Sequence, residues 1–514
     1  MNLRPMVIWG LLGTASCGGA PTPVAAPPPA TVAPPPPAPP PPPGPASAKG
    51  IWLGTIHAGP QQLRVQLHLD PADAGHGCAL DSLDQGAMGI PCRVTVGPGD
   101  AVALDVPAVH GTWTGTLSAD GTTLTGTWTQ QGAGIALVLT RQAAAIEARK
   151  EELQPAMAAV DVAGLQAVLD ADLRSALDAG DLAAGTGAGV TLGVVQRGTR
   201  RVFAYGPTKP DSVFEIGSIT KTFTGLLLAQ LVAQKKARLD EPVRALFPAG
   251  TVAKPAEGDE ITLLDLSDQH SGLPRLPENM KPADPENPYA DYDEKALFAW
   301  LGGHGVARPK DPTFGYSNLG VGLLGAALAR RAGVSYEALL KQEITGPLGM
   351  HDTVIRLTPA LAARLAEGHD GKHAAARPWD LDALAGAGGI RSTAGDMLTY
   401  LEAQLHPEAL PARVTASGAG KTLPAAIRES HVVRARAGEG DEIALNWMRS
   451  TASGRYWHNG ATGGYTAFAA FDPGKDVGVV VLSNTQSLLA DKLGAHVLQR
   501  LAGEPAIALG PPVP

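Results

Sequence analysis

The chain has 514 residues, and its 41 Lys and Arg against 49 Asp and Glu give a formal net charge of −8. Hydrophobic residues make up 44% and charged residues 18%, which is typical of a folded soluble protein and excludes a disordered or coiled-coil chain. The acidic excess, without any basic run, argues against a nucleic-acid partner, and three cysteines are too few for a disulfide framework or a four-thiolate zinc site.

The first 17 residues have the order of a secretion signal. Arg4 precedes the apolar run Met6–Leu12, which is too short to span a bilayer, and small residues follow it up to Cys17. Small residues directly before a cysteine resemble a bacterial lipoprotein signal, in which Cys17 becomes the acylated first residue of the mature chain. The alternative is an ordinary cleaved signal with an incidental cysteine. We expect a secreted, periplasmic protein that meets a bacterial membrane only through this lipid anchor.

A proline-rich linker is expected over residues 18–49. Its Pro/Ala tract, Pro21–Pro45, favours the polyproline II conformation, which rises about 3.1 Å per residue. A semi-rigid stalk of this kind holds a folded body away from a surface.

Residues 50–141 are expected to form a small β-barrel or β-sandwich domain. Apolar residues alternate with other residues over 63–69, 102–106 and 135–139, which is the period of half-buried strands. Between residues 112 and 128, Asp120-Gly121 predicts a hairpin because its glycine tolerates a positive φ. The pattern therefore predicts an antiparallel all-β module, in which we find no catalytic motif.

Two features of this module leave alternatives open. Cys78 and Cys92 either pair as a disulfide, which an oxidising compartment allows, or stay separate thiols. Trp52, Trp113 and Trp128 either line a ligand cavity or fill the core, as aromatic residues at strand spacing usually do.

After a connector at 142–160, residues 161–505 show predicted strands at both ends and helices between them. Apolar residues at helical spacing from Leu165 to Leu177 predict an amphipathic helix that stops at Gly180. Strands are expected within 190–206, at 465–471 and at 477–482, and a final helix at 486–501. The sheet of this segment is therefore completed by its C-terminal residues, with a helical region inserted.

Ser218 and Lys221 form the first candidate catalytic pair. They lie three residues apart at the start of a predicted helix, so both side chains are expected on the same face. A serine hydroxyl is a weak nucleophile until a base removes its proton, and a desolvated lysine with a lowered pKa can do this. Taken alone the pattern is weak, because a helix-capping serine followed by a solvated lysine is common.

Two further motifs follow in order. Tyr316 and Asn318 precede an apolar helix, and His458 and Gly460 precede a strand. The ordered triple Ser-x-x-Lys, Tyr-x-Asn and His-x-Gly resembles the serine β-lactamase and penicillin-binding superfamily, in the branch that contains class C β-lactamases, D-alanyl-D-alanine carboxypeptidases, D-aminopeptidases and esterases. The resemblance runs from residue 160 to residue 505 and includes three supporting stretches, 261–266, 270–274 and 388–393.

The resemblance implies an α/β fold and a role for each site residue. The fold is a sandwich with an antiparallel sheet and a helical lobe, here preceded by the small all-β domain. Ser218 would be the acylated nucleophile, Lys221 its activating partner and Tyr316 the base that passes the proton to the leaving group. Asn318 would bind the substrate, and the backbone N–H groups of Ser218 and Ala461 would form the oxyanion hole. A phenol of pKa about 10 acts as a base only if cations stabilise its phenolate.

The third motif departs from the class C β-lactamase pattern, which has Lys-Thr-Gly where this chain has His458-Asn459-Gly460. An imidazole of pKa about 6.5 is mostly neutral above about pH 7, so we expect His458 to capture a substrate carboxylate more weakly. Activity on acidic substrates should then fall between about pH 6 and 8. We expect Gly460, Gly463 and Gly464 to let substrate lie against the strand edge.

We expect a serine hydrolase that acts through an acyl-serine on amide, lactam or ester substrates, in the manner of a β-lactamase or D,D-peptidase. The first alternative is an esterase or D-aminopeptidase with the same intermediate. The second is a non-catalytic binding or sensor lipoprotein, against which the intact set of motif residues argues. The resemblance implies no metal and no organic cofactor, and the expected partner is a small-molecule or peptide substrate.

Overall fold

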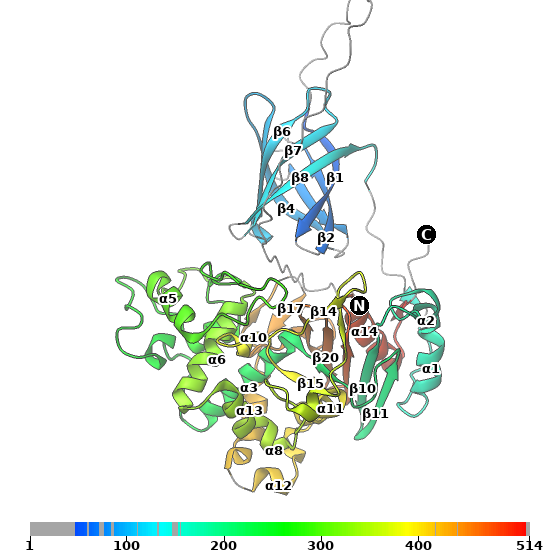
Figure 1. Ribbon diagram of the computed structural model, residues 1–514, viewed down its shortest axis with the longest axis vertical. Coiled ribbons are helices and arrows are strands. Elements are labelled where there is room, and N and C mark those ends of the chain that lie inside the picture. Colours follow the sequence, from blue (N-terminus) through cyan, green and yellow to red (C-terminus); the bar gives the residue numbers. More distant parts are fainter. Residues whose placement is uncertain are drawn as a thin grey trace, which may run out of the picture. The chain divides into compact units, whose positions relative to one another are not determined.

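The computed structural model describes residues 47–58, 61–70, 77–83, 87–109, 111–130, 133–145, 153–154, 156–416, 418–438 and 440–509. The predicted signal with Cys17 and the tract Pro21–Pro45 lie outside the described residues. The chain divides into two compact units, one over Arg4–Lys150 and the other made mainly of Glu151–Pro514 (Figure 1). No helix in the described part of the chain has both the length and the apolar character needed to cross a bilayer.

The first unit is a closed antiparallel β-barrel, in which each strand pairs with the next along the chain and β1 pairs with β8 (Figure 1). Its strands are β1 (Gly50–Ala58), β2 (Gln61–Leu69), β3 (Cys78–Ser82), β4 (Ala87–Val96), β5 (Ala101–Val106), β6 (Gly111–Leu117), β7 (Thr123–Gln130) and β8 (Ala133–Gln142), with the short turn η2 (Pro107–Val109) between β5 and β6. Every second residue of β5 is buried, as the alternating pattern predicts. The predicted all-β module is confirmed, and the predicted hairpin is the β6–β7 pair, in which Leu117 lies opposite Leu124.

Side chains fill the interior of the barrel. Trp52, Trp113 and Trp128 are fully buried. The ring of Trp128 lies where a side chain at residue Gly111 would project, and the ring of Trp113 lies where one at Gly115 would project. The three tryptophans therefore belong to the hydrophobic core of the barrel, as aromatic residues at strand spacing usually do.

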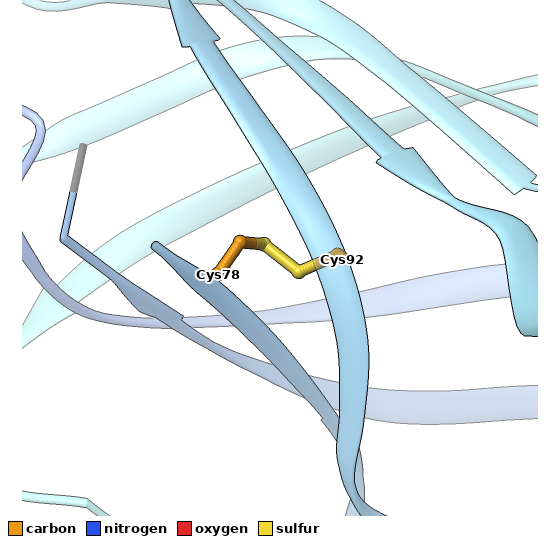
Figure 2. The surroundings of a disulfide bond; sticks show 2 residues. All are labelled: Cys78 and Cys92. Carbon is orange, nitrogen blue, oxygen red and sulfur yellow. A yellow bond between two sulfur atoms is a disulfide. The ribbon is translucent and has the colours of Figure 1, made fainter. Parts of the chain in front are cut away.

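A disulfide joins Cys78 and Cys92 (Figure 2). The two residues lie opposite one another in the β3–β4 register, with their Cα atoms 4.9 Å apart. Both side chains belong to the barrel core. The bond links neighbouring strands whose cysteines are separated by 14 residues in the chain.

The second unit is built on an antiparallel sheet with the strand order β11-β10-β21-β20-β19-β18-β17-β16. These strands are β10 (Val190–Gln196), β11 (Thr199–Tyr205), β16 (Ala435–Arg436), β17 (Asp441–Ile443), β18 (Met448–Ser450), β19 (Tyr456–Ala461), β20 (Thr466–Asp472) and β21 (Val477–Ser483). The strands predicted at the two ends of the segment are β10, β11, β20 and β21, and β10 pairs directly with β21. The prediction that C-terminal residues complete the sheet is confirmed.

Helices cover both faces of this sheet. On one face, Leu398 of α11 (Ala394–Leu405) lies where a side chain on Gly193 of β10 would project. On the other face, Phe468 of β20 lies against Gly494 of α14 (Leu489–Ala502). Successive strand residues point to opposite faces, and these two contacts come from opposite faces of the pleat. The unit is an α/β sandwich, which confirms the predicted fold class.

A helical lobe is inserted between β11 and β16. At its centre is α3 (Thr220–Ala233), which is almost entirely buried and packs against α6 (Asn318–Ala332), α10 (Ala385–Gly388) and α13 (Leu423–Ser430). One hydrophobic cluster joins this lobe to the sheet. The remaining elements of the unit are β9 (Leu153–Gln154), α1 (Leu165–Asp172), α2 (Arg174–Ala179), β12 (Val213–Glu215), η3 (Gly217–Ile219), η4 (Val243–Leu246), α4 (Leu263–Ser267), α5 (Glu294–His304), α7 (Tyr336–Leu340), η5 (Lys341–Thr345), α8 (Gly346–Leu348), α9 (Pro359–Ala362), β13 (Gly368–His369), β14 (Ala375–Ala376), β15 (Arg391–Thr393), η6 (Pro407–Ala409), α12 (Ala412–Thr415), η7 (Gly418–Lys421) and β22 (Ala506–Ile507).

The helix predicted from Leu165 to Leu177 is divided at Leu173 into α1 and α2. The N–H group of Leu173 still donates to the carbonyl oxygen of Leu169 at 2.8 Å, so the apolar stripe continues across the break. Leu165, Leu169 and Leu173 are fully buried, which is why their spacing resembled that of one amphipathic helix.

Candidate active site

Ser218 lies in the turn that joins β12 to α3. The turn is the single 3-10 turn η3, in which Gly217 has a φ of +49°, a conformation that residues with a side chain rarely adopt. The N–H group of Ile216 donates to the carbonyl oxygen of Ile390 at 3.0 Å and fixes the start of the turn. The stretch 388–393 noted in the sequence therefore supports the backbone at Ser218.

Strand β19 places the third motif beside this turn. A Cβ atom on Gly460 would lie 2.1 Å from the carbonyl oxygen of Ile216 and 2.9 Å from the backbone nitrogen of Ser218. A Cβ atom on Gly217 would lie 2.6 Å from the backbone nitrogen of Ala461. These two glycines let the backbone of η3 and the backbone of β19 touch, which brings the N–H groups of Ser218 and Ala461 to one small region.

The role predicted for the glycine of this strand and for the two glycines of the turn that follows it is wrong. Gly460, Gly463 and Gly464 were expected to leave room for substrate, but each faces the protein itself. A Cβ atom on Gly463 would lie 2.5 Å from the indole nitrogen of Trp379, and one on Gly464 would lie 2.9 Å from the Cα atom of Gly368. The missing side chains make room for close packing of the chain.

Lys221 contacts Ser218 directly. Its Nζ atom lies 2.9 Å from Ser218 Oγ and 2.6 Å from the carbonyl oxygen of Ala387 in α10. The side chain is fully buried, and burial lowers the pKa of Lys221 well below its usual value, with the Arg275 guanidinium lowering it further. Nζ donates to both oxygens, and in its neutral form the amine can keep the hydrogen bond to Ala387 while it accepts the hydroxyl proton of Ser218. The pair is therefore arranged for deprotonation of the serine.

Tyr316 and Asn318 are presented by the turn that enters α6. Ser317 lies between them and caps the helix, and its own N–H group donates to Gln269 Oε1 at 2.8 Å. Asn318 Nδ2 donates to the Tyr289 hydroxyl at 3.3 Å, while Asn318 Oδ1 has no hydrogen-bond partner among the described residues. The cap fixes the backbone between the two motif residues, and one amide atom of Asn318 stays available to a ligand.

Two basic side chains flank the ring of Tyr316. Lys221 Nζ lies 4.9 Å and Arg275 Cζ lies 5.2 Å from the ring centroid, and the ring centroid of His458 is 6.3 Å away. The Tyr316 hydroxyl is buried and makes no hydrogen bond of ordinary geometry with any described residue. Burial raises the pKa of Tyr316 to about 12, and the neighbouring Ser218 hydroxyl and Arg275 guanidinium offset part of this increase.

His458 is buried and neutral. Its Nδ1 atom lies 2.6 Å from the carbonyl oxygen of Asn459, so Nδ1 carries the proton and donates it. Burial lowers the pKa of His458 to about 3, and the nearby Lys221 amine contributes to the lowering. The remaining ring nitrogen, Nε2, can only accept a hydrogen bond. The predicted change of charge on His458 between about pH 6 and 8 is therefore wrong, since burial keeps the imidazole neutral throughout that range.

A small pocket opens at Ser218. Asn318 and Ala461 line it together with the serine, so all three motifs, which are far apart in the sequence, meet at one hydroxyl. Most of the remaining wall is aromatic or aliphatic, and it is made by Tyr289, Trp379, Leu381, Ala387, Gly388 and Thr462. The pocket combines polar groups at its reacting end with an apolar wall, as small-molecule sites usually do.

Comparison with known proteins places this site in a family. The model of the family described as Beta-lactamase matches residues 175–504, which include every site residue described here. The chain belongs to the Beta-lactamase family. It is 29% identical over 352 residues to "Beta-lactamase" of Pseudomonas fluorescens, which covers 60% of this chain and 92% of that protein.

Two further known proteins are similar to this chain. The D-alanyl-D-alanine-carboxypeptidase/endopeptidase AmpH of Escherichia coli (strain K12) is 29% identical over 313 residues, or 58% of this chain and 80% of that protein. "Beta-lactamase" of the same organism is 26% identical over 342 residues, or 58% of this chain and 84% of that protein. Membership of this family makes the chain a hydrolase. The barrel strands lie outside the matched segment.

Sequence reasoning about this Beta-lactamase-family chain missed Arg275 and Tyr289. Arg275 directly follows the stretch 270–274, which the resemblance included, and this position was the available signal. Tyr289 lies in a segment rich in proline and acidic residues that carries no motif. Their contacts with Tyr316 and Asn318 depend on how distant loops fold back, which spacing along the chain does not reveal.

Proposed function

We propose that this Beta-lactamase-family protein is a serine hydrolase that acylates Ser218 with the carbonyl group of an amide, lactam or ester. The observation that carries the proposal is the 2.9 Å contact between Lys221 Nζ and Ser218 Oγ. The lysine is fully buried and its pKa is lowered, which favours the neutral amine that can accept the serine proton.

The reaction proceeds in two balanced halves. A bond forms between Ser218 Oγ and the substrate carbonyl carbon while the hydroxyl proton passes to Lys221. The bond from that carbon to the leaving nitrogen or oxygen then breaks, and Tyr316 relays the proton to the leaving atom. Water attacks the acyl-enzyme, its proton passes through the same pair to Ser218 Oγ, and the acid is released.

The backbone N–H groups of Ser218 and Ala461 are proposed to bind the negative oxygen that forms during both attacks. The backbone contact between η3 and β19 supports this assignment, because it holds the two nitrogens close together. Both residues line the pocket at the reacting hydroxyl. Loss of one oxyanion donor typically costs about 3 to 4 kcal/mol of transition-state stabilisation.

The neutrality of His458 favours a second candidate, an esterase or D-aminopeptidase that uses the same acyl-Ser218. A charged group in the third motif would attract a substrate carboxylate, whereas His458 Nε2 offers only a lone pair. Such an acceptor suits a hydroxyl, amine or amide N–H of the substrate. The names of the relatives, which are β-lactamases and a D-alanyl-D-alanine carboxypeptidase, support the lactam and peptide substrates of the first candidate.

Hydrolysis of three substrates at equal enzyme concentration tests the proposal. They are nitrocefin, a D-Ala-D-Ala peptide and a short-chain nitrophenyl ester. We expect the wild type to hydrolyse at least one of them and the Ser218→Ala variant to hydrolyse none, while Ser453→Ala, outside the site, retains wild-type activity. A preference for the uncharged ester supports the second candidate.

The non-catalytic alternative has its own readout. A fluorescent penicillin and a fluorophosphonate should label the wild type and not the Ser218→Ala variant. Absence of both label and turnover in the wild type would contradict the proposed function and favour a binding or sensor protein.

A further inference from the structure

Arg275 is a buried cation that the proposed reaction does not use. The residue is 8% exposed. Its backbone carbonyl accepts a hydrogen bond from Leu319 at 3.1 Å, but its guanidinium donates no hydrogen bond and forms no ion pair with any residue that the structure describes. Burying a charge without a partner is unfavourable. Because burial of this charge is unfavourable, its presence indicates that Arg275 has a functional role.

The groups around Arg275 are Lys221 and Tyr316 of the proposed reaction and one further phenol, that of Tyr289. The guanidinium carbon lies 5.2 Å from the ring centroid of Tyr316, and Lys221 Nζ lies 4.9 Å from the same centroid. The Tyr289 phenol also interacts with Arg275 electrostatically. From β19, the ring of His458 faces Tyr316.

Carboxylates on neighbouring elements are engaged with other partners. Glu215 of β12 forms a 3.1 Å ion pair with Arg391 of β15. Asp491 of α14 accepts a 2.8 Å hydrogen bond from Asn459 of β19. No carboxylate in the described part of the chain pairs with Arg275, so its positive charge acts on the phenols and the amine around it.

The positive charge of Arg275 opposes the protonation of both Lys221 and Tyr316. It lowers the pKa of Lys221, because two adjacent cations repel, and it lowers the pKa of Tyr316, because it attracts the phenolate. Burial lowers the pKa of Arg275 itself, but a guanidinium starts from a value so high that it stays charged. His458 is neutral and cannot supply this charge.

We propose that Arg275 is a positioning residue whose charge favours the neutral, proton-accepting form of Lys221 beside Tyr316 at neutral pH. It acts through these two groups and does not touch the reacting atoms. The inference rests on the proposed acyl-serine function, since it assigns the charge that prepares the base of that reaction.

The pH profile of Ser218 labelling tests this role. The rate of labelling by an uncharged fluorophosphonate is measured from about pH 5 to about pH 10 in the wild type and in Arg275→Gln, Arg275→Lys and Arg330→Gln. Arg330 is a matched control because it lies on the same lobe, in α6, and pairs with Glu294 away from the site. Circular dichroism confirms folding, and Arg275→Met replaces Arg275→Gln if the latter is unfolded.

We expect the rising limb of the profile to move to higher pH by about 1 to 2 units in Arg275→Gln. The rate near pH 7 should fall about tenfold or more and recover at high pH, where the base is deprotonated without help. Arg275→Lys should retain a midpoint near that of the wild type because it keeps the charge, and Arg330→Gln should be unchanged.

Two results would overturn the inference. A loss that is equal at every pH would indicate a purely structural role for Arg275. An unshifted midpoint with a raised KM for acidic substrates alone would make Arg275 an anchor for a substrate anion. If the wild type itself is not labelled at Ser218, both the proposed function and the inference fail, whereas a labelled wild type with an unshifted Arg275→Gln profile defeats the inference alone.

Discussion

At the scale of single residues, burial decides which side chains carry a proton. Lys221 and His458 are both basic groups, yet burial lowers the pKa of each and so disfavours their charged forms. Tyr316 is affected in the opposite direction, because its charged form is the anion. The balance of charge in the site therefore depends on Arg275, which the mechanism would otherwise leave unexplained.

The neutrality of His458 gives a pH prediction. Because burial lowers the pKa of His458 to about 3, the imidazole does not titrate between about pH 5 and 8. We expect the ratio of kcat/KM between the wild type and His458→Gln on an uncharged ester to stay constant within about twofold over that range. A ratio that changes about tenfold with a midpoint near pH 6.5 would show that His458 becomes charged in the active enzyme.

At the scale of elements, β19 connects the nucleophile turn to a helix on the far side of the sheet. Gly460 contacts η3, whereas Asn459, the residue before it, points to the other face and donates to Asp491 in the first turn of α14 at 2.8 Å. The strand is therefore held from both faces. Its position sets the distance between the two proposed oxyanion donors.

Adding one methyl group to β19 should separate these donors. In Gly460→Ala the Cβ atom would lie 2.1 Å from the Ile216 carbonyl oxygen, so the strand and η3 must move apart. We expect the rate of Ser218 acylation to fall by about 100-fold or more. The matched control is Gly303→Ala in α5, where the added atom meets nothing within 4 Å. Equal rates in the two variants would contradict the assigned geometry.

The hydrogen bond between Asn459 of β19 and Asp491 of α14 involves a buried carboxyl group, which makes the stability of the fold depend on pH. Burial raises the pKa of Asp491 to about 6, so the folded protein favours the protonated acid, and the free energy of unfolding falls as pH rises from about 4 to about 6. In Asp491→Asn this slope should weaken, with a gain of about 1 to 2 kcal/mol near pH 7. Urea unfolding of the wild type and the variant at about pH 4 and about pH 7 measures the change in the free energy of unfolding. The same slope in both proteins would contradict a raised pKa for Asp491.

Patterns along the chain predicted the elements and the three motifs, but not the contacts between them. Strand alternation and the order of Ser218, Tyr316 and His458 depend on local spacing, which a sequence displays directly. Which neighbour fills the space beside Gly460, and how deeply His458 is buried, depend on residues brought together by folding. Those two expectations were wrong for this reason, and Arg275 was missed for the same one.

At the scale of the whole molecule, the chain combines a closed barrel with a hydrolase unit. The barrel has its own hydrophobic core and its own disulfide, and the residues of the proposed active site all come from the second unit. Each unit therefore contains the interactions that stabilise it. The predicted signal, and the predicted linker as far as residue 46, lie outside the described residues.

Removing the disulfide should affect the barrel alone. Cys78 and Cys92 are separated by 14 residues, and closing a loop of this size contributes about 3 kcal/mol by restricting the unfolded chain. We expect the full-length Cys78→Ser/Cys92→Ser variant to unfold its barrel at a lower temperature in calorimetry. Its rate of Ser218 labelling should match that of the wild type, and a large loss of labelling would contradict the independence of the site.

We propose that Cys17 anchors the protein in a bacterial membrane, as the predicted signal suggests. On expression in a Gram-negative host, the wild type should fractionate with membranes and require detergent for release. The Cys17→Ser variant should appear in the soluble periplasmic fraction with unchanged Ser218 labelling. Recovery of the wild type in the soluble fraction would support the alternative of an ordinary cleaved signal.

Mapping the covalent adduct by mass spectrometry examines the acyl-serine reaction most directly. After incubation with a small panel of lactams, peptides and esters, the wild type should gain the mass of one acyl group, located on the peptide that contains Ser218. Ser218→Ala should gain none. Lys221→Met should form the adduct at about one hundredth of the wild-type rate or below. An adduct on a different residue, or turnover that survives in Ser218→Ala, would contradict the account.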